Sequence, residues 1–399
     1  MNKNIDGKIK NLHLLVMLIL LVAVGQMAQT IYVPVITKIA HDLSILPGSI
    51  QHVMAAYLMT YGLSQLIYGP LSDSIGRRPV ILAGMIIFLS GSLGGLLSNG
   101  LAMLVVSSAV QGMGIGVAGV MARTLPRDLY GSIALRYVNS MLNMGILISP
   151  LLAPLIGGVL AMFFGWRANY AFLLALGAGV SYAMFSWLPE TRPVITKKRR
   201  MFSSIRELLA DGRFTCYLMM MISALSGIVV FEGSCGVLMG DILGLSSVSV
   251  SILFILPIPG AFFGSWYAGR NGKPFNSLMW HSVISCLLGG LLMWTPSWFG
   301  VMNLWTLIVP ATLFFFGAGI MFPLATTGAM EPFPYLAGSA GALVGGMQNL
   351  GSGLAALLSA TLPQTGQFSV GLLMFAMSLL ILICWWPLSN RLDQENNIR

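Results

Sequence analysis

The chain holds twelve apolar runs, each close to the roughly 20 residues that a helix needs to cross a bilayer. Six runs come first, a polar stretch at 189–212 follows, and six more runs complete the chain. The runs lie near 13–37, 49–69, 79–98, 101–122, 137–161, 167–188, 214–238, 247–268, 276–295, 303–325, 338–361 and 367–388. We therefore expect an all-α membrane protein with two six-helix bundles, 1–188 and 213–399, joined by a linker at 189–212.

Charged residues make up only 8% of the chain and apolar residues 56%, whereas a soluble domain has about a quarter of its residues charged. The basic residues that give the chain its net charge of +9 lie in short loops and form no patch for nucleic acid. The expected partner is therefore the lipid bilayer. Nineteen of the 21 Lys and Arg residues fall on the side of the two termini and the linker. The positive-inside rule therefore predicts that both termini are cytoplasmic, and only Lys38 and Arg167 lie on the opposite side.

A charged turn occurs twice in the chain. The first copy, Gly69-Pro-Leu-Ser-Asp73-Ser-Ile-Gly76-Arg77-Arg78-Pro79, lies between the second and third runs. The second copy, Gly264-Ser-Trp-Tyr-Ala268-Gly-Arg270-Asn-Gly272-Lys273-Pro274, starts 195 residues later in the 399-residue chain. Each copy opens with Gly and closes with a basic residue and Pro, so the second half is interpreted as a diverged duplicate of the first. Such internal repeats are typical of transporters.

The first turn resembles the cytoplasmic signature of the major facilitator superfamily, in which a Gly, an Asp, a Gly and a basic pair recur. Pro189-Glu190-Thr191 after the sixth run resembles a second mark of that family. Ala153-Pro154-Leu-Ile-Gly157-Gly158 resembles the motif of its drug/proton antiporters. Three further stretches, 25–32, 121–130 and 330–334, extend the resemblance over nearly the whole chain.

The resemblance implies twelve helices in two pseudo-symmetric bundles, alternating access, and proton-driven export of varied amphipathic drugs across the bacterial inner membrane. It implies small amphipathic drugs and protons as the transported partners, and a monomer is expected. One departure concerns proton coupling. Ser108 occupies the position at which many relatives keep an intramembrane Arg.

Glu232 is the one acidic residue well inside an apolar run. A charged carboxylate in a bilayer costs several kcal/mol unless it is paired, protonated or faces a cavity. This cost suits Glu232 to taking up and releasing a proton, or to sensing a cationic drug, and the alternative is a structural Glu that bonds to a neighbouring helix.

Polar and aromatic side chains recur at helical spacing in the first two runs. The residues are Gln26, Gln29 and Thr30 in the first run, with the aliphatic Val33 at the same helical spacing, and Tyr57 and Tyr61 in the second. Such faces suit a cavity that binds amphipathic molecules by stacking and a few hydrogen bonds. The alternative is that these side chains bond the helices to one another.

The repeat nominates equivalent lining residues in the second half. They are Ile222, Ser226 and Glu232 in the seventh run, Phe254 and Ile258 in the eighth, and Trp305 in the tenth. Trp305 has an alternative interpretation as part of an interfacial aromatic belt with Trp294 and Trp298.

Asp73, Arg77 and Arg78 lie too close to the membrane edge to bind a drug, and they are predicted to act in gating. A carboxylate there can cap a helix or pair with a base across the bundles. Arg123, at the end of the fourth run, is the predicted partner. The alternative is that the basic residues only fix the topology.

The sequence has no phosphate-binding loop, no nucleophile–base pair and no His or Cys cluster, so neither an enzyme nor a metal or cofactor is expected. Two rival functions stay open. One is an uptake symporter of the same fold, and the other is a polytopic membrane protein that transports nothing.

Overall fold

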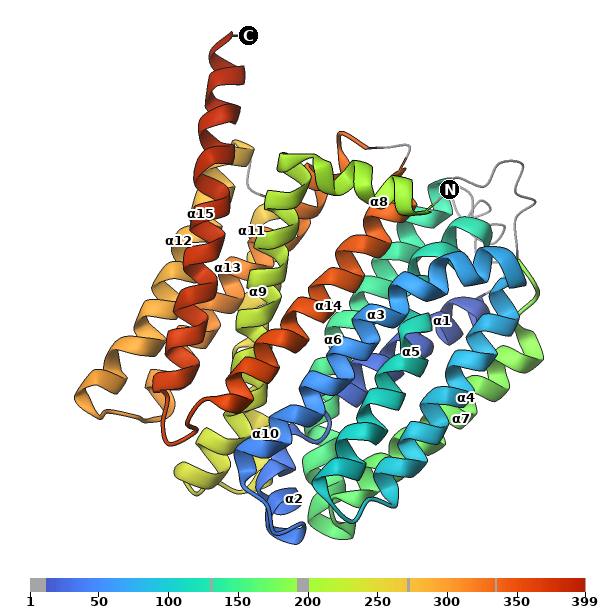
Figure 1. The fold of residues 1–399 in the computed structure, drawn as a ribbon, viewed down its shortest axis with the longest axis vertical. Coiled ribbons are helices and arrows are strands. Elements are labelled where there is room, and N and C mark those ends of the chain that lie inside the picture. Colours follow the sequence, from blue (N-terminus) through green and yellow to red (C-terminus); the bar gives the residue numbers. More distant parts are fainter. Residues whose placement is uncertain (1–11, 130–131, 192–200, 271–272, 334–335, 399) are drawn as a thin grey trace, which may run out of the picture. The chain divides into compact units, whose positions relative to one another are not determined.

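The computed structural model describes residues 12–129, 132–191, 201–270, 273–333 and 336–398, and every regular element in these ranges is helical (Figure 1). Twelve helical segments of membrane length occur in this part of the chain. In unbroken form they are α1 (Leu12–Thr30), α3 (Gln51–Ile75), α4 (Arg77–Leu96), α5 (Leu101–Leu129), α6 (Ser132–Phe164), α7 (Arg167–Trp187), α12 (Phe275–Trp294), α13 (Leu304–Met330), α14 (Ala337–Thr361) and α15 (Phe368–Ile398). The other two are α9 (Gly212–Cys235), which the π-helix η3 (Gly236–Ile242) continues, and the pair α10 (Ser247–Ile255) and α11 (Ile258–Arg270).

Nine spans in the described residues are long and apolar enough to cross a membrane by length and composition alone. The three segments outside that set are α3, α6 and α14, which have 25, 33 and 25 residues. The predicted all-α architecture is confirmed. A short additional helix, α8 (Met201–Ala210), precedes α9.

The chain separates into two compact units. Unit 1 comprises Met1–Tyr32 and Ala56–Arg199, and unit 2 comprises Val33–Ala55 and Arg200–Arg399. The division predicted at 1–188, 189–212 and 213–399 stays a prediction, and these units depart from it in one segment. Val33–Ala55 packs with the C-terminal helices, because its aliphatic side chains, among them Val33, Ile39 and Ile50, are fully buried there.

Glycines allow the helices of unit 1 to approach closely. A Cβ on Gly91 of α4 would lie 2.5 Å from the backbone nitrogen of Gln111 in α5, so no larger residue fits without a shift. Gly114 of α5 meets the backbone of Phe88, and Gly116 meets Ser64 of α3. In this unit the glycine-rich fourth span therefore serves helix packing, as small residues do in membrane proteins.

Proline positions decide where the helices break. α1 ends at Thr30 and the chain continues as a turn and a short 3₁₀-helix, η1 (Val33–Val35), because Pro34 offers no N–H and disfavours the α conformation of Val33. The eighth span divides into α10 and α11 next to Pro257 and Pro259, as a proline hinge predicts. By contrast, α6 continues through Pro150 and Pro154 as one helix.

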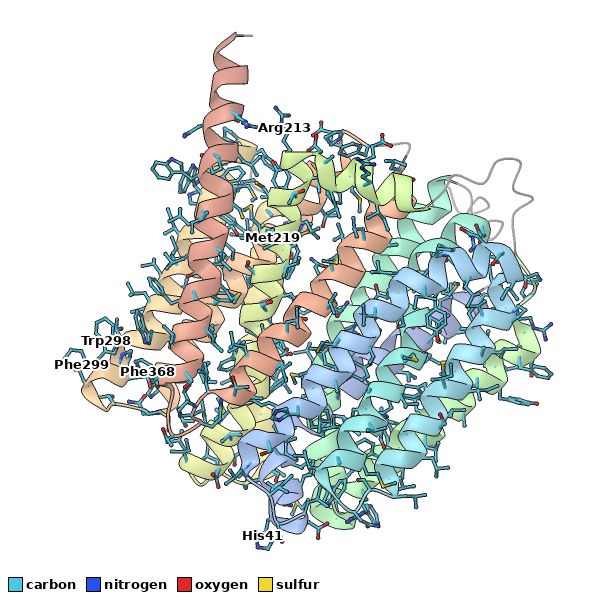
Figure 2. The ribbon with its side chains drawn as sticks, viewed as in Figure 1. His41, Arg213, Met219, Trp298, Phe299 and Phe368 are labelled. Carbon is cyan, nitrogen blue, oxygen red and sulfur yellow. The ribbon has the colours of Figure 1, made fainter. Side chains whose placement is uncertain are left out.

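In unit 2, α9 packs against α13, α14 and α15, and α12 packs against α13 and α15. The ring of Phe314 in α13 fills the space beside Gly227 of α9. Trp298, Phe299 and Phe368 lie together at one end of this unit, and Arg213 lies near its other end (Figure 2). A ring of exposed aromatic side chains at one end is typical of a membrane–water interface.

The segment Val33–Ala55 contains η1, α2 (Ile36–Asp42), the 3₁₀-helix η2 (Pro47–Ile50) and the first five residues of α3. It packs against α9, η3, α10 and α14. The remaining residues of α3, from Ala56 onward, belong to unit 1 although the helix is continuous.

Candidate functional site

The charged turn between α3 and α4 is a built cluster centred on Arg77. The Arg77 guanidinium donates from Nε to Asp128 Oδ2 at 3.0 Å, and from Nη1 to Asp73 Oδ1 at 2.5 Å and to Ser72 Oγ at 2.6 Å. Arg77 is only 4% exposed, although it lies at a membrane edge. Because a guanidinium presents several donors in a fixed plane, one Arg joins the end of α3 to the end of α5.

Glu190 supplies the N-terminal cap of α4. Its two carboxylate oxygens accept hydrogen bonds from the backbone N–H groups of Arg77, at 2.9 Å, and Arg78, at 3.2 Å. Both N–H groups lack partners within the helix, and the positive end of the helix dipole favours a carboxylate. Arg78 in turn donates to the carbonyl of Phe185 near the end of α7 and lies 5.4 Å above the ring of that residue. The start of α4 is thereby fixed to α7.

Gly76 makes this geometry possible. Its φ of 121° is open to glycine and strained for other residues. A Cβ at this position would also lie 2.6 Å from Glu190 Oε2. The turn therefore requires glycine for two physical reasons: the backbone has a positive φ, and the capping carboxylate occupies the space in which a Cβ would lie.

The structure places the predicted gating residues as follows. Asp73 pairs with Arg77, four residues along the same turn, and the cap of α4 comes from Glu190. Arg123 lies in α5, but its side chain is outside the described residues. The partner that sequence reasoning missed is Asp128, one helical turn and a half farther along α5. Its signal was an acid at the end of the fourth run, on the side of Arg77.

The second turn lacks this cluster. Ala268 stands where the first copy has Asp73, and Arg270 lies 5.7 Å above the ring of Trp266. Lys273 donates to the hydroxyl of Tyr267 at 3.3 Å. No carboxylate contacts Arg270 or Lys273 within the described ranges. The second turn has Gly272 at the position of Arg77, so it lacks the arginine as well as the acid of the first cluster.

Glu232 lies near the end of α9 and is 6% exposed. With Arg77 it is one of two buried charged residues in the described part of the chain. Its backbone carbonyl accepts a bond from the thiol of Cys235 at 3.2 Å, and the π-helix η3 starts four residues after it. Such π-helical segments are frequent at functional sites. Glu232 is buried in an apolar helix, as the sequence prediction assumed. Its role in proton coupling stays a prediction.

The predicted lining residues of unit 1 gather on α1 and α3. The Tyr57 and Tyr61 rings stack with centroids 5.9 Å apart and planes at 9°, and the Tyr57 hydroxyl donates to the carbonyl of Gly25 at 2.6 Å. That bond joins α3 to α1, in agreement with the alternative that these side chains bond the helices to one another. Gln26 and Gln29 are half-buried, and Thr30 is buried.

Val33 does not share a helical face with the polar residues of α1, so this part of the prediction is wrong. α1 ends at Thr30, and the spacing of seven residues therefore no longer places Val33 above Gln26. The Val33 carbonyl instead meets Gly236 at the start of η3 in unit 2.

The predicted residues of unit 2 fall into two groups. Ser226, Phe254 and Ile258 are buried, and half-buried Ile222 packs against Gly351 of α14. Trp305 is 76% exposed in the first turn of α13. Its exposure favours the aromatic belt over a lining role.

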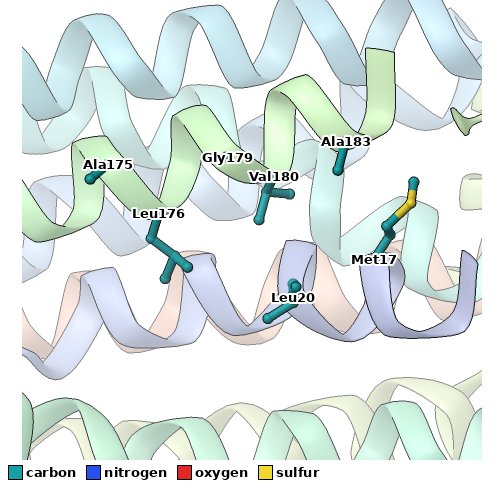
Figure 3. Close-up of a pocket in the computed structure, with 7 residues that line it drawn as sticks. All are labelled: Met17, Leu20, Ala175, Leu176, Gly179, Val180 and Ala183. Carbon is teal, nitrogen blue, oxygen red and sulfur yellow. The ribbon is translucent and has the colours of Figure 1, made fainter. Parts of the chain in front are cut away.

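A groove of about 250 Å³ lies between α1 and α7 within unit 1 (Figure 3). It is lined by Met17, Leu20, Ala175, Leu176, Gly179, Val180 and Ala183, which are all apolar. None of the predicted site residues lines this groove. It is therefore a separate feature of the surface formed by these two helices.

Sequence reasoning also missed a buried polar cluster in unit 2. Gln51, at the start of α3, donates from Nε2 to Ser234 Oγ of α9 at 3.0 Å and to Gln364 Oε1 at 3.2 Å. Gln364 donates to the carbonyl of Ser359, whose hydroxyl lies 3.4 Å from that of Ser234. A glutamine at the start of an apolar run was the signal for this cluster.

Known proteins resemble this chain over most of its length. Multidrug resistance protein D of Escherichia coli (strain K12) is 63% identical over 386 residues, which cover 97% of this chain and 98% of that protein. A chloramphenicol resistance protein of Pseudomonas aeruginosa is 27% identical over 319 residues, 79% of this chain and 76% of that protein. The solved structure of the multidrug transporter EmrD from Escherichia coli is 64% identical, covers 93% of this chain and 99% of its own, and superimposes with a TM-score of 0.46.

The sequence model of one family matches residues 18–356. That match covers most of the twelve helical segments and includes the charged turn with Asp73, Arg77 and Asp128. The family resemblance predicted from the turn and from the two further motifs is confirmed. The chain belongs to the Major Facilitator Superfamily and has its twelve-helix membrane fold.

Proposed function

We propose that this protein exports chemically varied amphipathic compounds by alternating access, driven by protons. The observation that carries the proposal is its 63% identity, over 97% of the chain, to a protein named for multidrug resistance. The second relative, named for chloramphenicol resistance, supports export over uptake. Neither rival function has a specific observation in its favour.

Glu232 is the proposed site of proton coupling. It is a carboxylate buried in an apolar helix, and the charged form of such a group needs a partner, a cavity or a proton. Ser108, which is also buried, occupies the position of the Arg that many relatives keep. In this chain we therefore assign proton coupling to Glu232 in unit 2.

The proposed drug-binding side chains combine a few polar groups with aromatic and aliphatic ones. From unit 1 they include Tyr57, Tyr61, Gln26 and Gln29, and from unit 2 the buried Ser226, Phe254 and Ile258. A mostly apolar lining with few fixed hydrogen bonds tolerates varied substrates, because no single polar pattern has to be matched.

The proposed location is the bacterial inner membrane, with both termini and the linker in the cytoplasm and the protein acting as a monomer. The distribution of Lys and Arg, nineteen on one side and two on the other, supports this orientation.

A drug-susceptibility panel tests the proposal. The chain is expressed in bacteria that lack their own efflux pumps, and growth is scored against unrelated amphiphilic compounds with and without a protonophore. We expect protection against several compounds, lost when the proton gradient collapses. Protection that persists without the gradient, or no protection at all, would contradict proton-driven export.

A further inference from the structure

We infer that Cys216 of α9 and Cys384 of α15 form an oxidisable dithiol, a modification site at which a small-molecule disulfide drives a disulfide bond between the two helices. Sequence spacing does not reveal this pair, because the two cysteines are far apart in the chain and each stands alone in an apolar run. Both residues belong to unit 2. The site goes beyond the proposed transport function and does not depend on it.

The two thiols lie side by side between helices that pack together. They are hydrogen-bonded to each other, and α9 packs against α15 along this side. The residues that follow them, Tyr217 and Trp385, give an independent view of the same contact. Both rings meet the ring of Phe275 in α12, with centroids 6.4 and 6.3 Å away. The turn of α9 that carries one cysteine therefore lies beside the turn of α15 that carries the other.

The surroundings of the pair favour reaction with a solute from water. Both cysteines are half-buried, so neither sulfur is sealed inside the unit. Arg391 follows Cys384 by seven residues on the same face of α15 and interacts electrostatically with Cys216. Arg213, three residues before Cys216, lies near the end of the unit (Figure 2). Reactive cysteines are typically found in such partly exposed, basic surroundings.

The other two cysteines of the chain provide a contrast within the same unit. Cys235 and Cys286 are fully buried, and their thiols donate to the backbone carbonyls of Glu232 and Phe314. Buried cysteines of this kind are inert packing residues. Oxidation is therefore expected at one pair of cysteines and not at the other two.

The reaction is thiol–disulfide exchange. One protein thiolate attacks a sulfur of the small disulfide and releases the first small thiol, which leaves a mixed disulfide on the protein. The second protein thiolate then attacks the protein sulfur of this mixed disulfide and releases the second small thiol. Overall, the protein thiols lose two hydrogens, and the small disulfide is reduced to two thiols. The protein sulfurs have to approach from hydrogen-bonding distance to a bond of about 2.05 Å, and the helices that carry them are already in contact.

The location of the pair indicates when the bond forms. In the proposed orientation this end of unit 2 faces the cytoplasm, where small thiols keep such a pair reduced. The bond therefore forms when oxidised small-molecule disulfides accumulate, and it is reversed when they are reduced. Cys216 lies about 24 Å along α9 from Glu232, so the modification occurs away from the proposed proton site.

Titration with dipyridyl disulfide tests the site. The folded full-length protein in detergent is treated with this reagent, which releases one coloured pyridinethione for each exchange step. Peptide mass spectrometry then locates pyridyl adducts and cross-linked peptides. The variants Cys216→Ser, Cys384→Ser and the double variant are treated in the same way, and all of them keep Cys235 and Cys286. Serine has nearly the size of cysteine, and thermal unfolding checks that each variant is folded.

We expect the wild-type protein to release two pyridinethiones per chain, to carry no adduct and to yield a peptide that links Cys216 to Cys384, which dithiothreitol separates. Each single variant should release one pyridinethione and keep the pyridyl adduct on its remaining cysteine, because no second thiol resolves it. The double variant should release none.

Three results would overturn the inference. They are adducts on both cysteines of the wild-type protein without a cross-link, release by the double variant that equals the wild-type release, and no release from the folded wild-type protein. None of these results bears on transport, so the proposed function is tested separately.

Discussion

Glu232 combines burial, negative charge and an apolar helix, which is an arrangement that proteins keep in membranes chiefly for function. Arg77, the other buried charged residue in the described part of the chain, lies at a helix junction. Its guanidinium nitrogens lie 2.5 Å from a carboxylate oxygen of Asp73 and 3.0 Å from one of Asp128. The two residues therefore have different tasks. Arg77 stabilises a turn, and Glu232 is the residue for which we propose proton uptake and release.

Replacing Glu232 with Gln tests this assignment. The amide keeps the size of the side chain but cannot ionise, so we expect drug efflux that no longer responds to the proton gradient, with binding of neutral drugs retained. Dye efflux from inverted vesicles under an imposed pH gradient measures the response. Glu331→Gln, the same change at an exposed acid of unit 2, is the control and should leave coupling unchanged. Fully proton-dependent efflux by Glu232→Gln would remove Glu232 from the mechanism.

Gly76 offers a prediction about stability at the same scale. We expect Gly76→Ala to destabilise the protein by about 1–3 kcal/mol, because the φ of 121° is strained for alanine. The new methyl group would also displace the capping carboxylate of Glu190. Thermal unfolding in detergent measures the change. Gly69→Ala, seven residues earlier with no atom near its Cβ position, is the matched control and should be neutral or slightly stabilising. Equal melting temperatures for both variants would contradict the argument.

Among the elements, the turn between α3 and α4 shows how one loop fixes four helix ends. Arg77 joins α3 to α5, and Glu190 and Arg78 join α4 to the end of α7. The turn in the second half has Ala268 in place of Asp73 and Gly272 in place of Arg77, and Lys273 is its basic residue at the position of Arg78. The ion pairs of Arg77 with Asp73 and Asp128 therefore have no equivalent in the described residues of the second turn.

The substitution Asp73→Asn probes the turn without unfolding it. The Asp73 side chain is 44% exposed, and such an ion pair contributes at most about 1 kcal/mol to stability. We expect slower transport, with drug binding and melting temperature nearly unchanged, because the balance between conformations shifts. Binding assays and transport assays on the same preparation separate these effects. A parallel loss of binding and transport would show that Asp73 serves folding instead.

The sequence predicts the elements well and their partners less well. The apolar runs locate the helices, as for the run at 303–325 and α13 (Leu304–Met330), because membrane thickness sets the length. Helix ends are less well predicted, since the run at 101–122 corresponds to α5, which continues to Leu129. The prolines at 257 and 259 predict the break between α10 and α11, whereas the break after Thr30 follows from Pro34, whose effect the helical spacing ignored. The pairings of Arg77 with Asp128 and Glu190 span 51 and 113 residues. No local pattern encodes such distances.

In the whole molecule, the chain passes between the two compact units at three places: after Tyr32, within α3 after Ala55, and after Arg199. The segment Val33–Ala55 therefore packs with one unit and continues in sequence into the other at both of its ends. The bilayer supplies the solvent for both units, since only 8% of the residues are charged. In the proposed mechanism, proton uptake and drug export are linked through conformation, so the two ligands need not touch.

Transport by purified protein in proteoliposomes tests the central claim most directly. The wild-type protein is reconstituted, a pH gradient is imposed by dilution, and the movement of a fluorescent amphiphilic cation is followed together with the internal pH. The account predicts that the cation moves against its own gradient while protons move down theirs, and that both fluxes stop when a protonophore removes the pH gradient. Cation movement that proceeds only down its own gradient, at the same rate with or without a pH difference, would contradict proton-driven export.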